Sequence, residues 1–258
     1  MAKPRVLVLR APGTNCDQET AFAFEQAGGS ADVWHVNRVL ERPPMMQDYQ
    51  ILSVPGGFSY GDDVAAGRIL GNLFQHHLRD ALAEFKAAGK LILGICNGFQ
   101  VLIKSGVLLA DDAAGPPATL CWNDLGRYED RWVHLAVEGD KCVFLRGIER
   151  LELPIAHAEG KFAARNQAAL DRLAAAGQLV LRYVNPSGAA EVPYPANPNG
   201  SQAHVAGLCD ETGRVLGLMP HPERNIDPTH HPQWTRRPAS GPGDGLRIFQ
   251  NAIEYFAA

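Results

Sequence analysis

Several patterns that would assign a function class at once are missing from this sequence. No apolar run approaches the ~20 residues of a membrane-spanning helix, and the formal net charge of −4 gives no basic field that would attract nucleic acid. Neither Gly-x-x-x-x-Gly-Lys-Ser/Thr nor Gly-x-Gly-x-x-Gly occurs, so no ATP or dinucleotide site is expected. No Cys-x-x-Cys pair occurs either, which argues against a structural zinc site. We therefore predict a chain without membrane, nucleic-acid, metal or nucleotide-cofactor sites.

The composition is that of an ordinary globular protein. The chain has 258 residues, of which 46% are apolar and 20% charged, enough for one large core or two small domains. No internal repeat divides it, so we predict a single domain over residues 1–258. Its five cysteines are odd in number and widely spaced, which predicts free thiols and a cytoplasmic protein. They are Cys16, Cys96, Cys121, Cys142 and Cys209.

The first half of the chain alternates between strand and helix patterns. Apolar runs predict strands at residues 5–9, 31–36, 50–54 and 90–93. Helices are predicted at residues 14–28, where Thr14 and Asp17 have capping-box spacing, at 72–88, and at 99–104. Strands that alternate with helices form a parallel sheet covered on both faces, and ligands bind beyond the carboxyl ends of its strands.

The second half has shorter strand patterns and longer loops. Strands are predicted at residues 131–137, 179–184, 204–208 and 215–219, followed by an amphipathic helix at 245–256. Two long loops are predicted at Asn185–Gln202 and Asn225–Gly243. Loops of this length are usually functional, so each is either a contact surface for a partner or a plain solvent-exposed insertion.

The stretch Gly94-Ile95-Cys96-Asn97-Gly98 places a cysteine between a predicted strand and a predicted helix. Glycine two residues before and two after the cysteine gives the small flanks that a strained strand-to-helix elbow requires. The unpaired N–H groups at the start of the helix favour the thiolate form of the cysteine. We therefore interpret Cys96 as a nucleophile rather than as a small buried hydrophobic residue.

A histidine and a glutamate follow the last predicted strand, in Met219-Pro220-His221-Pro222-Glu223. Residues two apart in an extended chain share a face, so His221 and Glu223 are predicted to form a base with its orienting carboxylate. The alternatives are a surface histidine beside a glutamate and a zinc deaminase site, which also needs a Pro-Cys-x-x-Cys that is missing here. The adjacent pairs His76-His77 and His230-His231 lack ligand spacing and are predicted to be solvated.

Two further segments follow predicted strands at the same edge of the sheet. Pro55-Gly56-Gly57 is either a simple turn or an oxyanion hole, because glycine lets backbone N–H groups approach a reacting carbonyl closely. Cys16 either lines the same crevice or is a plain buried thiol. The remaining cysteines, Cys121, Cys142 and Cys209, are predicted to be structural.

With these segments in place, the chain resembles the class I (triad) glutamine amidotransferases. Among them it is similar to the glutaminase subunits of phosphoribosylformylglycinamidine synthase, an enzyme of purine biosynthesis. The matching segments are PGTNCDQE at residues 12–19, PGGFSYGDD at 55–63, GICNGFQVL at 94–102, LPIAHAEGKF at 153–162, NPNGS at 197–201 and MPHPER at 219–224. The resemblance implies a class I glutaminase-like α/β fold. Its features would be a mostly parallel central sheet, helices on both faces and additional short antiparallel strands.

The same resemblance implies roles for individual residues. Cys96 would be the nucleophile, His221 the acid and base, and Glu223 the residue that orients His221. The backbone N–H groups of Gly57 and Asn97 would stabilise the oxyanion. The side chain of Gln100 would contact the bound glutamine.

The resemblance also implies a substrate and a partner. Glutamine would be hydrolysed, and the ammonia would pass to a synthetase subunit, with or without a small accessory subunit. ATP and Mg²⁺ are expected on that synthetase, and no cofactor is expected in this chain. The chain is longer than the compact small-subunit type of the family, which leaves the kind of assembly open. The alternatives are a glutaminase subunit for a different acceptor and a cysteine-elbow hydrolase.

Overall fold

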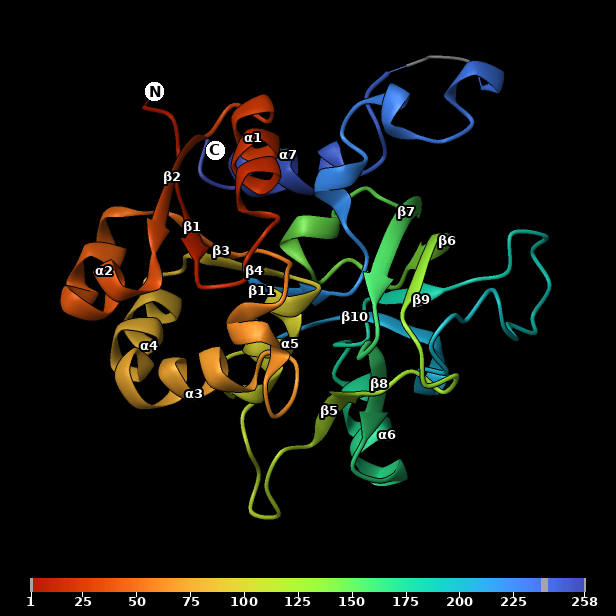
Figure 1. Cartoon of the computed structure of the whole chain (residues 1–258), viewed down its shortest axis with the longest axis horizontal. Helices are drawn as coiled ribbons and strands as arrows, with labels where there is room; N and C mark the ends of the chain where they lie inside the picture. Colours follow the sequence, from red (N-terminus) through yellow and green to blue (C-terminus); the bar gives the residue numbers. More distant parts are fainter. Residues whose placement is uncertain (1, 238–240, 258) are drawn as a thin grey trace.

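The computed structural model, which describes residues 2–237 and 241–257, is built on a nine-stranded sheet (Figure 1). Its strand order is β2-β1-β3-β4-β11-β10-β9-β6-β7. The first five strands of this order are parallel: β2 (Ser30–His35), β1 (Arg5–Arg10), β3 (Ile51–Val54), β4 (Leu91–Ile95) and β11 (Val215–Leu218). The other four continue the sheet with antiparallel pairing: β10 (Val205–Cys209), β9 (Leu181–Tyr183), β6 (Glu129–Val137) and β7 (Arg150–His157).

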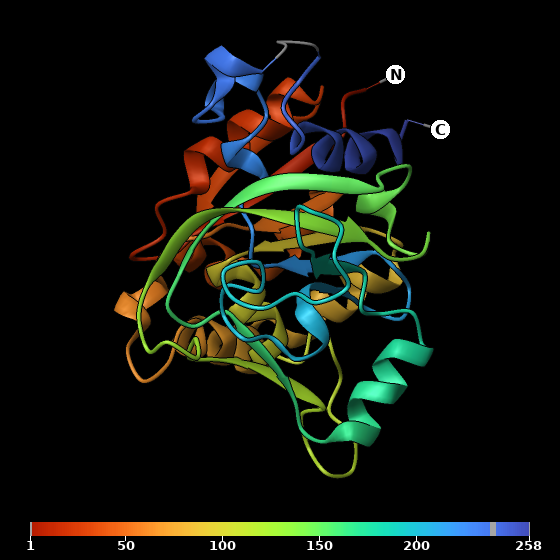
Figure 2. The same cartoon turned by 90° about the vertical axis from the view of Figure 1, so that its right-hand side faces the viewer.

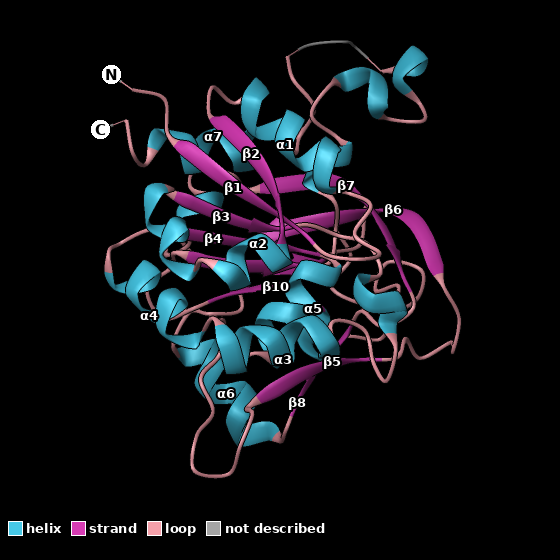
Figure 3. Cartoon of the chain, turned by 60° about the vertical axis from the view of Figure 1, so that its left-hand side comes forward, coloured by secondary structure: helices cyan, strands magenta, loops and turns pink. Residues whose placement is uncertain are grey.

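Helices cover both faces of the parallel half, which confirms the predicted fold class. Figure 3 shows α1 and α7 on one side of the sheet and α3, α4 and α5 on the other. A separate two-stranded antiparallel sheet, β5 (Ala118–Cys121) and β8 (Lys161–Ala164), lies beside α6. The helices are α1 (Asp17–Gln26), α2 (Val36–Glu41), α3 (Arg68–His77), α4 (Arg79–Ala87), α5 (Asn97–Lys104), α6 (Gln167–Ala175) and α7 (Leu246–Glu254). Among the described residues, no helix has both the length and the apolar character needed to cross a membrane.

Two predicted helix features in the first half are wrong. The helix predicted at 72–88 is two helices, because Leu78 leaves the helical conformation (φ −115°, ψ 4°) and buries its side chain in the core. The capping box predicted for Thr14 and Asp17 does not form. Thr14 Oγ1 instead accepts from the N–H of Ala11 at 3.1 Å, and α1 begins one residue after Cys16, which makes no side-chain cap. Tertiary contacts override the local signal at both positions.

Strand β7 is absent from the sequence prediction because Pro154 lies within it. Proline removes a backbone donor, so a strand pattern that contains it reads as irregular. In the structure β7 is the last strand of the sheet, where a missing N–H faces no neighbouring strand. Helices α2 and α6 and strands β5 and β8 are also missing from the sequence prediction.

The loop predicted at Asn185–Gln202 divides into two parts (Figure 2, cyan). Residues 186–191 are exposed, whereas Asn199 and Ser201 are buried against β8. Ser201 Oγ accepts from the N–H of Phe162 at 2.9 Å, and the amide of Asn199 donates to the Gly160 carbonyl at 2.8 Å. The second part of this loop therefore anchors β8. Of the loop predicted at Asn225–Gly243, residues 238–240 lie outside the described residues.

The elbow after β4 depends on close packing of α5 against the sheet. Strands β3, β4 and β11 are buried at every residue, as expected for strands covered on both faces. A Cβ built on Gly98 would lie only 1.8 Å from the carbonyl oxygen of Val54 in β3. One on Gly94 would lie 2.7 Å from the Gly98 carbonyl oxygen. The two glycines therefore set how closely α5 approaches β3 and β4.

Gly98→Ala is expected to destabilise the protein by ~3 kcal/mol or more, because the methyl group collides with rigid backbone of β3. Urea denaturation followed by circular dichroism measures this change. Gly71→Ala in α3 is the matched control. Its methyl group would make an ordinary 3.4 Å contact with Lys104, and a change within ~1 kcal/mol in either direction is expected. Equal denaturation midpoints for Gly98→Ala and the unmodified protein would contradict the packing described here.

Candidate active site

Cys96 lies on the predicted strand–turn–helix elbow. Strand β4 ends at Ile95, α5 begins at Asn97, and Cys96 between them has φ 50° and ψ −106°. A non-glycine residue with positive φ is strained, and such strain is typical of functional positions. The surrounding backbone holds this conformation, because the Cys96 N–H donates to the Leu218 carbonyl at 2.8 Å and its carbonyl accepts from Gln100 N–H at 3.1 Å.

His221 and Glu223 form a buried pair, as predicted. His221 Nδ1 lies 2.6 Å from Glu223 Oε1, and both side chains are almost completely buried. The predicted reason, a shared face of extended chain, is wrong. Pro222 instead begins a short 3-10 turn, Pro222–Arg224, which folds Glu223 back onto the imidazole. The N–H of His221 donates to the Pro154 carbonyl at 2.8 Å, so strand β7 holds the pair in place.

The sheet brings Cys96 and His221 together at its carboxyl edge. Strands β4 and β11 are parallel neighbours with Ile95 opposite Leu218, so the residues that follow them emerge side by side. Gly56, after β3, completes the site: a Cβ built on it would lie 2.7 Å from His221 Cε1 and 3.4 Å from Cys96 Cβ. His221 Nε2 is buried and has no hydrogen-bond partner among the described residues. The imidazole therefore keeps one nitrogen free for chemistry while the other is held by Glu223.

Electrostatics favour a protonated His221. Burial opposes the charged imidazolium, but the Glu223 carboxylate and the Cys96 and Cys16 sulfurs outweigh it, so the pKa of His221 lies well above its ordinary value. His157 shows the opposite behaviour: burial, with His221 nearby, lowers its pKa to about 3. His157 is therefore neutral beside the charged pair.

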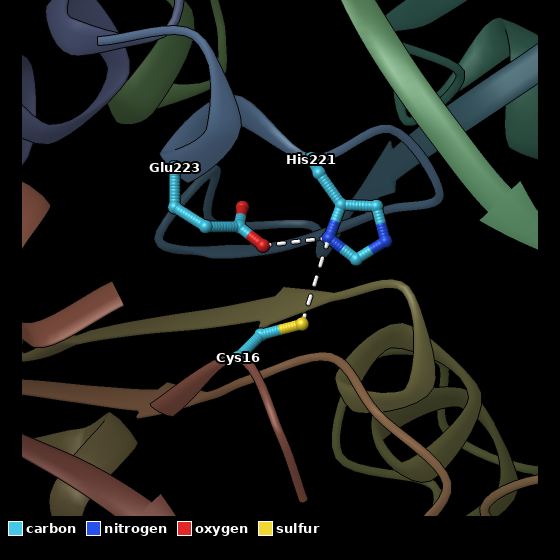
Figure 4. A group of neighbouring side chains, drawn as sticks. All are labelled: Cys16, His221 and Glu223. Atoms are coloured by element: carbon cyan, nitrogen blue, oxygen red, sulfur yellow. Dashed lines mark hydrogen bonds and ion pairs between the residues drawn. The ribbon is translucent and has the colours of Figure 1, made fainter. Parts of the chain in front are cut away.

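Cys16 is a buried thiol that also lies beside the catalytic histidine. Its Sγ lies 4.0 Å from His221 Nδ1, on the side of the ring that faces Glu223 (Figure 4). Arg224 Nη2 donates to Cys16 Sγ at 3.2 Å and is itself paired with Glu19 at 2.9 Å. Burial raises the pKa of Cys16 to about 11, so it is a thiol at neutral pH. The sequence feature that pointed to this location is the position of Cys16 in the turn that follows β1.

The residues predicted to bind and polarise a substrate lie around the elbow. Among the described residues, the backbone N–H groups of Gly57 and Asn97 have no hydrogen-bond acceptor. Asn97 is the first residue of α5, and the first N–H groups of a helix have no acceptor within the helix. The Gln100 side chain accepts from Asn97 Nδ2 at 2.9 Å and donates to the Glu159 carbonyl at 2.5 Å. Its orientation is therefore fixed.

Two acidic residues beside this network were not predicted from the sequence. Asp62 accepts from Asn97 Nδ2 at 3.0 Å, and burial together with Glu159 raises the pKa of Asp62 to about 6. Glu159 Oε2 accepts from Ala66 N–H at 3.2 Å and lies 3.9 Å from Lys104 Nζ. Both acids belong to segments that carry the family resemblance, GGFSYGDD and AHAEGKF. Their presence in these segments is the sequence feature from which a role in the site could have been predicted.

The other predicted residues lie where expected, with one exception. His76, His77 and His230 are exposed, but His231 is buried and its Nε2 lies 3.2 Å from Glu152 of β7. The prediction of a solvated His231 is therefore wrong, because the partner carboxylate comes from a strand that the sequence prediction missed. All five cysteines are free, and Cys142 and Cys209 are buried in the core.

Comparison with known proteins places this site in a family. Residues 3–256 match a family model described as a CobB/CobQ-like glutamine amidotransferase domain. The phosphoribosylformylglycinamidine synthase subunit PurQ of Dehalococcoides mccartyi is 44% identical over 99% of this chain and 98% of its own length. The PurQ of Archaeoglobus fulgidus is 40% identical over 97% of this chain and 96% of its own length.

A solved structure agrees with this assignment. The structure of PurLQS from Thermotoga maritima contains a chain that superimposes with a TM-score of 0.75 at 31% identity, covering 99% of this chain and all of that one. Its sheet and helices thus follow the same course over nearly the whole length. The chain therefore belongs to the CobB/CobQ-like glutamine amidotransferase family and, within it, to the PurQ subunits of phosphoribosylformylglycinamidine synthase.

Proposed function

We propose that this chain hydrolyses glutamine to glutamate and ammonia as the glutaminase subunit of phosphoribosylformylglycinamidine synthase. The observation that carries the proposal is the buried His221–Glu223 pair, set beside the strained Cys96 at the carboxyl edge of the sheet. The relatives that bear the PurQ name cover the chain from end to end. On this proposal, residues 1–258 form one glutamine amidotransferase domain of a cytoplasmic enzyme.

The geometry supports a thioester mechanism. With the thiol proton of Cys96 held on the protonated His221, the Cys96 thiolate attacks the carboxamide carbon of glutamine. The oxyanion of the tetrahedral intermediate is stabilised by the free N–H groups of Gly57 and Asn97. His221 then protonates the departing nitrogen, ammonia leaves, and a glutamyl thioester remains on Cys96. Water attacks the thioester with His221 as base, which releases glutamate and restores the thiol.

Supporting roles follow from the contacts around this centre. Glu223 holds the imidazole orientation through Nδ1 and stabilises the imidazolium that forms. We expect Gln100, whose side chain is held by Asn97 and the Glu159 carbonyl, to contact the bound glutamine. The sequence carries no phosphate-binding motif, so ATP and Mg²⁺ belong to a synthetase subunit that receives the ammonia.

The partner is expected to control the glutaminase. Free hydrolysis would waste glutamine, so the synthetase subunit should order or complete the site. Coupling of ordinary allosteric size, ~1–3 kcal/mol, would raise glutamine affinity roughly 5- to 150-fold and strengthen partner binding by the same factor. Glutaminase kinetics of the purified chain, with and without the synthetase subunit, ATP and its ribonucleotide substrate, measure this effect.

Two controls separate the alternatives. An unrelated ATP-dependent ligase in place of the synthetase should leave the kinetics unchanged. Full turnover by the isolated chain, unaffected by the cognate synthetase, would favour a stand-alone cysteine hydrolase. Stimulation by the synthetase of a different amidotransferase would instead indicate another acceptor.

A further inference from the structure

Three possible metal-ligand atoms lie close together around Nδ1 of His221, the ring nitrogen opposite the free Nε2. Cys16 Sγ, His221 Nδ1 and a Glu223 carboxylate oxygen all lie within 4.8 Å of one another, and all three residues are buried (Figure 4). They come from the turn after β1 and from the segment after β11, so the fold rather than the sequence brings them together. The proposed thioester chemistry makes no use of the Cys16 sulfur.

We propose that Cys16, His221 and Glu223 form an inhibitory site for a divalent cation of the Zn²⁺ type. Thiolate, imidazole and carboxylate are the ligand types that Zn²⁺ selects, and three protein ligands leave a fourth position for water. The inhibitory part of the proposal rests on the proposed glutaminase function, because the metal takes the nitrogen through which Glu223 orients His221. The binding part stands on the donor set alone.

The charges around the cluster suit a bound dication. A thiolate on Cys16 and a carboxylate on Glu223 together neutralise two positive charges, so the occupied site is uncharged in a buried position. Glu223 Oε2 is buried without a hydrogen-bond partner among the described residues, so it is available as a ligand. Arg224 donates to the Cys16 sulfur at 3.2 Å, and Glu19 holds that guanidinium. An N–H donor to a ligating sulfur is the outer support that metal sites commonly have.

Only side-chain rearrangement is needed to close the site. Zinc bonds of ~2.3 Å to sulfur and ~2.0 Å to nitrogen place neighbouring donors roughly 3 to 4 Å apart. Cys16 Sγ and His221 Nδ1 are already 4.0 Å apart, whereas Nδ1 and Glu223 Oε1 are 2.6 Å apart and must separate. Metal binding therefore displaces the proton between His221 and Glu223, as well as the thiol proton that Cys16 donates to Asn15 at 3.1 Å.

Cobalt binding tests the site independently of activity. Co²⁺ added to the unmodified chain should give the intense bands of a tetrahedral site together with thiolate-to-metal charge transfer. Cys16→Ser should remove the charge-transfer band. It should also weaken Zn²⁺ binding by ~100-fold or more, as measured by competition with a chromophoric chelator. Cys96→Ala and the control Cys121→Ser should bind as the unmodified chain does. Circular dichroism confirms that each variant is folded.

Inhibition is measured in the assembled synthase as the Zn²⁺ concentration that halves each protein's own glutaminase rate. The unmodified enzyme and Cys121→Ser should share one value, and Cys16→Ser should need a concentration ~100-fold higher. Loss of cobalt charge transfer in Cys96→Ala, with Cys16→Ser unaffected, would place the metal on the nucleophile and overturn the proposal. Binding that depends on Cys16 without any inhibition would overturn its inhibitory part.

Discussion

Cys96→Ala is expected to lower glutamine hydrolysis by roughly 10⁴- to 10⁶-fold, since loss of a catalytic nucleophile leaves only binding and oxyanion stabilisation. The variant should also lose the covalent adduct that a glutamine-like electrophile forms with the enzyme. Alanine removes only the sulfur and keeps a Cβ on the elbow. Glutamate release in the assembled synthase and the mass of the labelled tryptic peptide measure the two effects.

Cys16 provides the matched control for this experiment. Both cysteines are buried beside His221, yet only Cys96 is on the elbow between β4 and α5. Labelled Cys16→Ser should therefore still carry the adduct on Cys96. An adduct on Cys16 in the unmodified enzyme, or substantial turnover by folded Cys96→Ala, would show that the nucleophile is assigned to the wrong residue.

The second large effect is expected at His221. His221→Ala should lose turnover by roughly 10⁴-fold or more, because the thiol proton and the leaving nitrogen then have no acid or base. Glu223→Gln alone should lose less, since the imidazole remains but its orientation and positive charge are less well supported. The double variant should be hardly slower than His221→Ala, because Glu223 acts through His221.

Steady-state kinetics of the two single variants and the double variant form a complete cycle. The Cys96 adduct provides a separate readout, since slower labelling in both single variants indicates a less activated thiol. Losses that simply multiply in the double variant would mean that Glu223 works independently of His221. Glu152→Gln, which changes the carboxylate of the unrelated His231 pair, serves as the control for removing a partly buried acid that pairs with a histidine.

The sequence predicts the elbow well because small residues are needed at fixed places. Gly94 and Gly98 have no room for a Cβ, and this requirement is local enough to be read as a pattern. The pairing of His221 with Glu223 is predicted correctly from the wrong geometry, since a turn begun by Pro222 replaces the expected extended chain. Residue type and spacing thus identified the pair, while its conformation depended on the backbone after β11.

Other parts of the site depend on long-range contacts that leave no local pattern. The position of Cys16 beside His221 follows from the strand order β1-β3-β4-β11 and from the turn at Gly56, which no spacing in the chain encodes. The burial of His231 needs Glu152, which is carried by a proline-containing edge strand. Strands β1, β3, β4 and β11 were predictable because they are short, mainly apolar runs, whereas the antiparallel half was predictable only in part.

The pairing of β4 with β11 has a consequence for how the protein is made. At a synthesis rate of ~5–20 residues per second, Cys96 leaves the ribosome on the order of ten seconds before His221. Throughout that interval the thiol has no base, so the nascent chain cannot attack glutamine. Pairing between strands so far apart in the chain is also slow to form. Glutaminase activity therefore cannot appear before β11 has paired with β4 in the middle of the sheet.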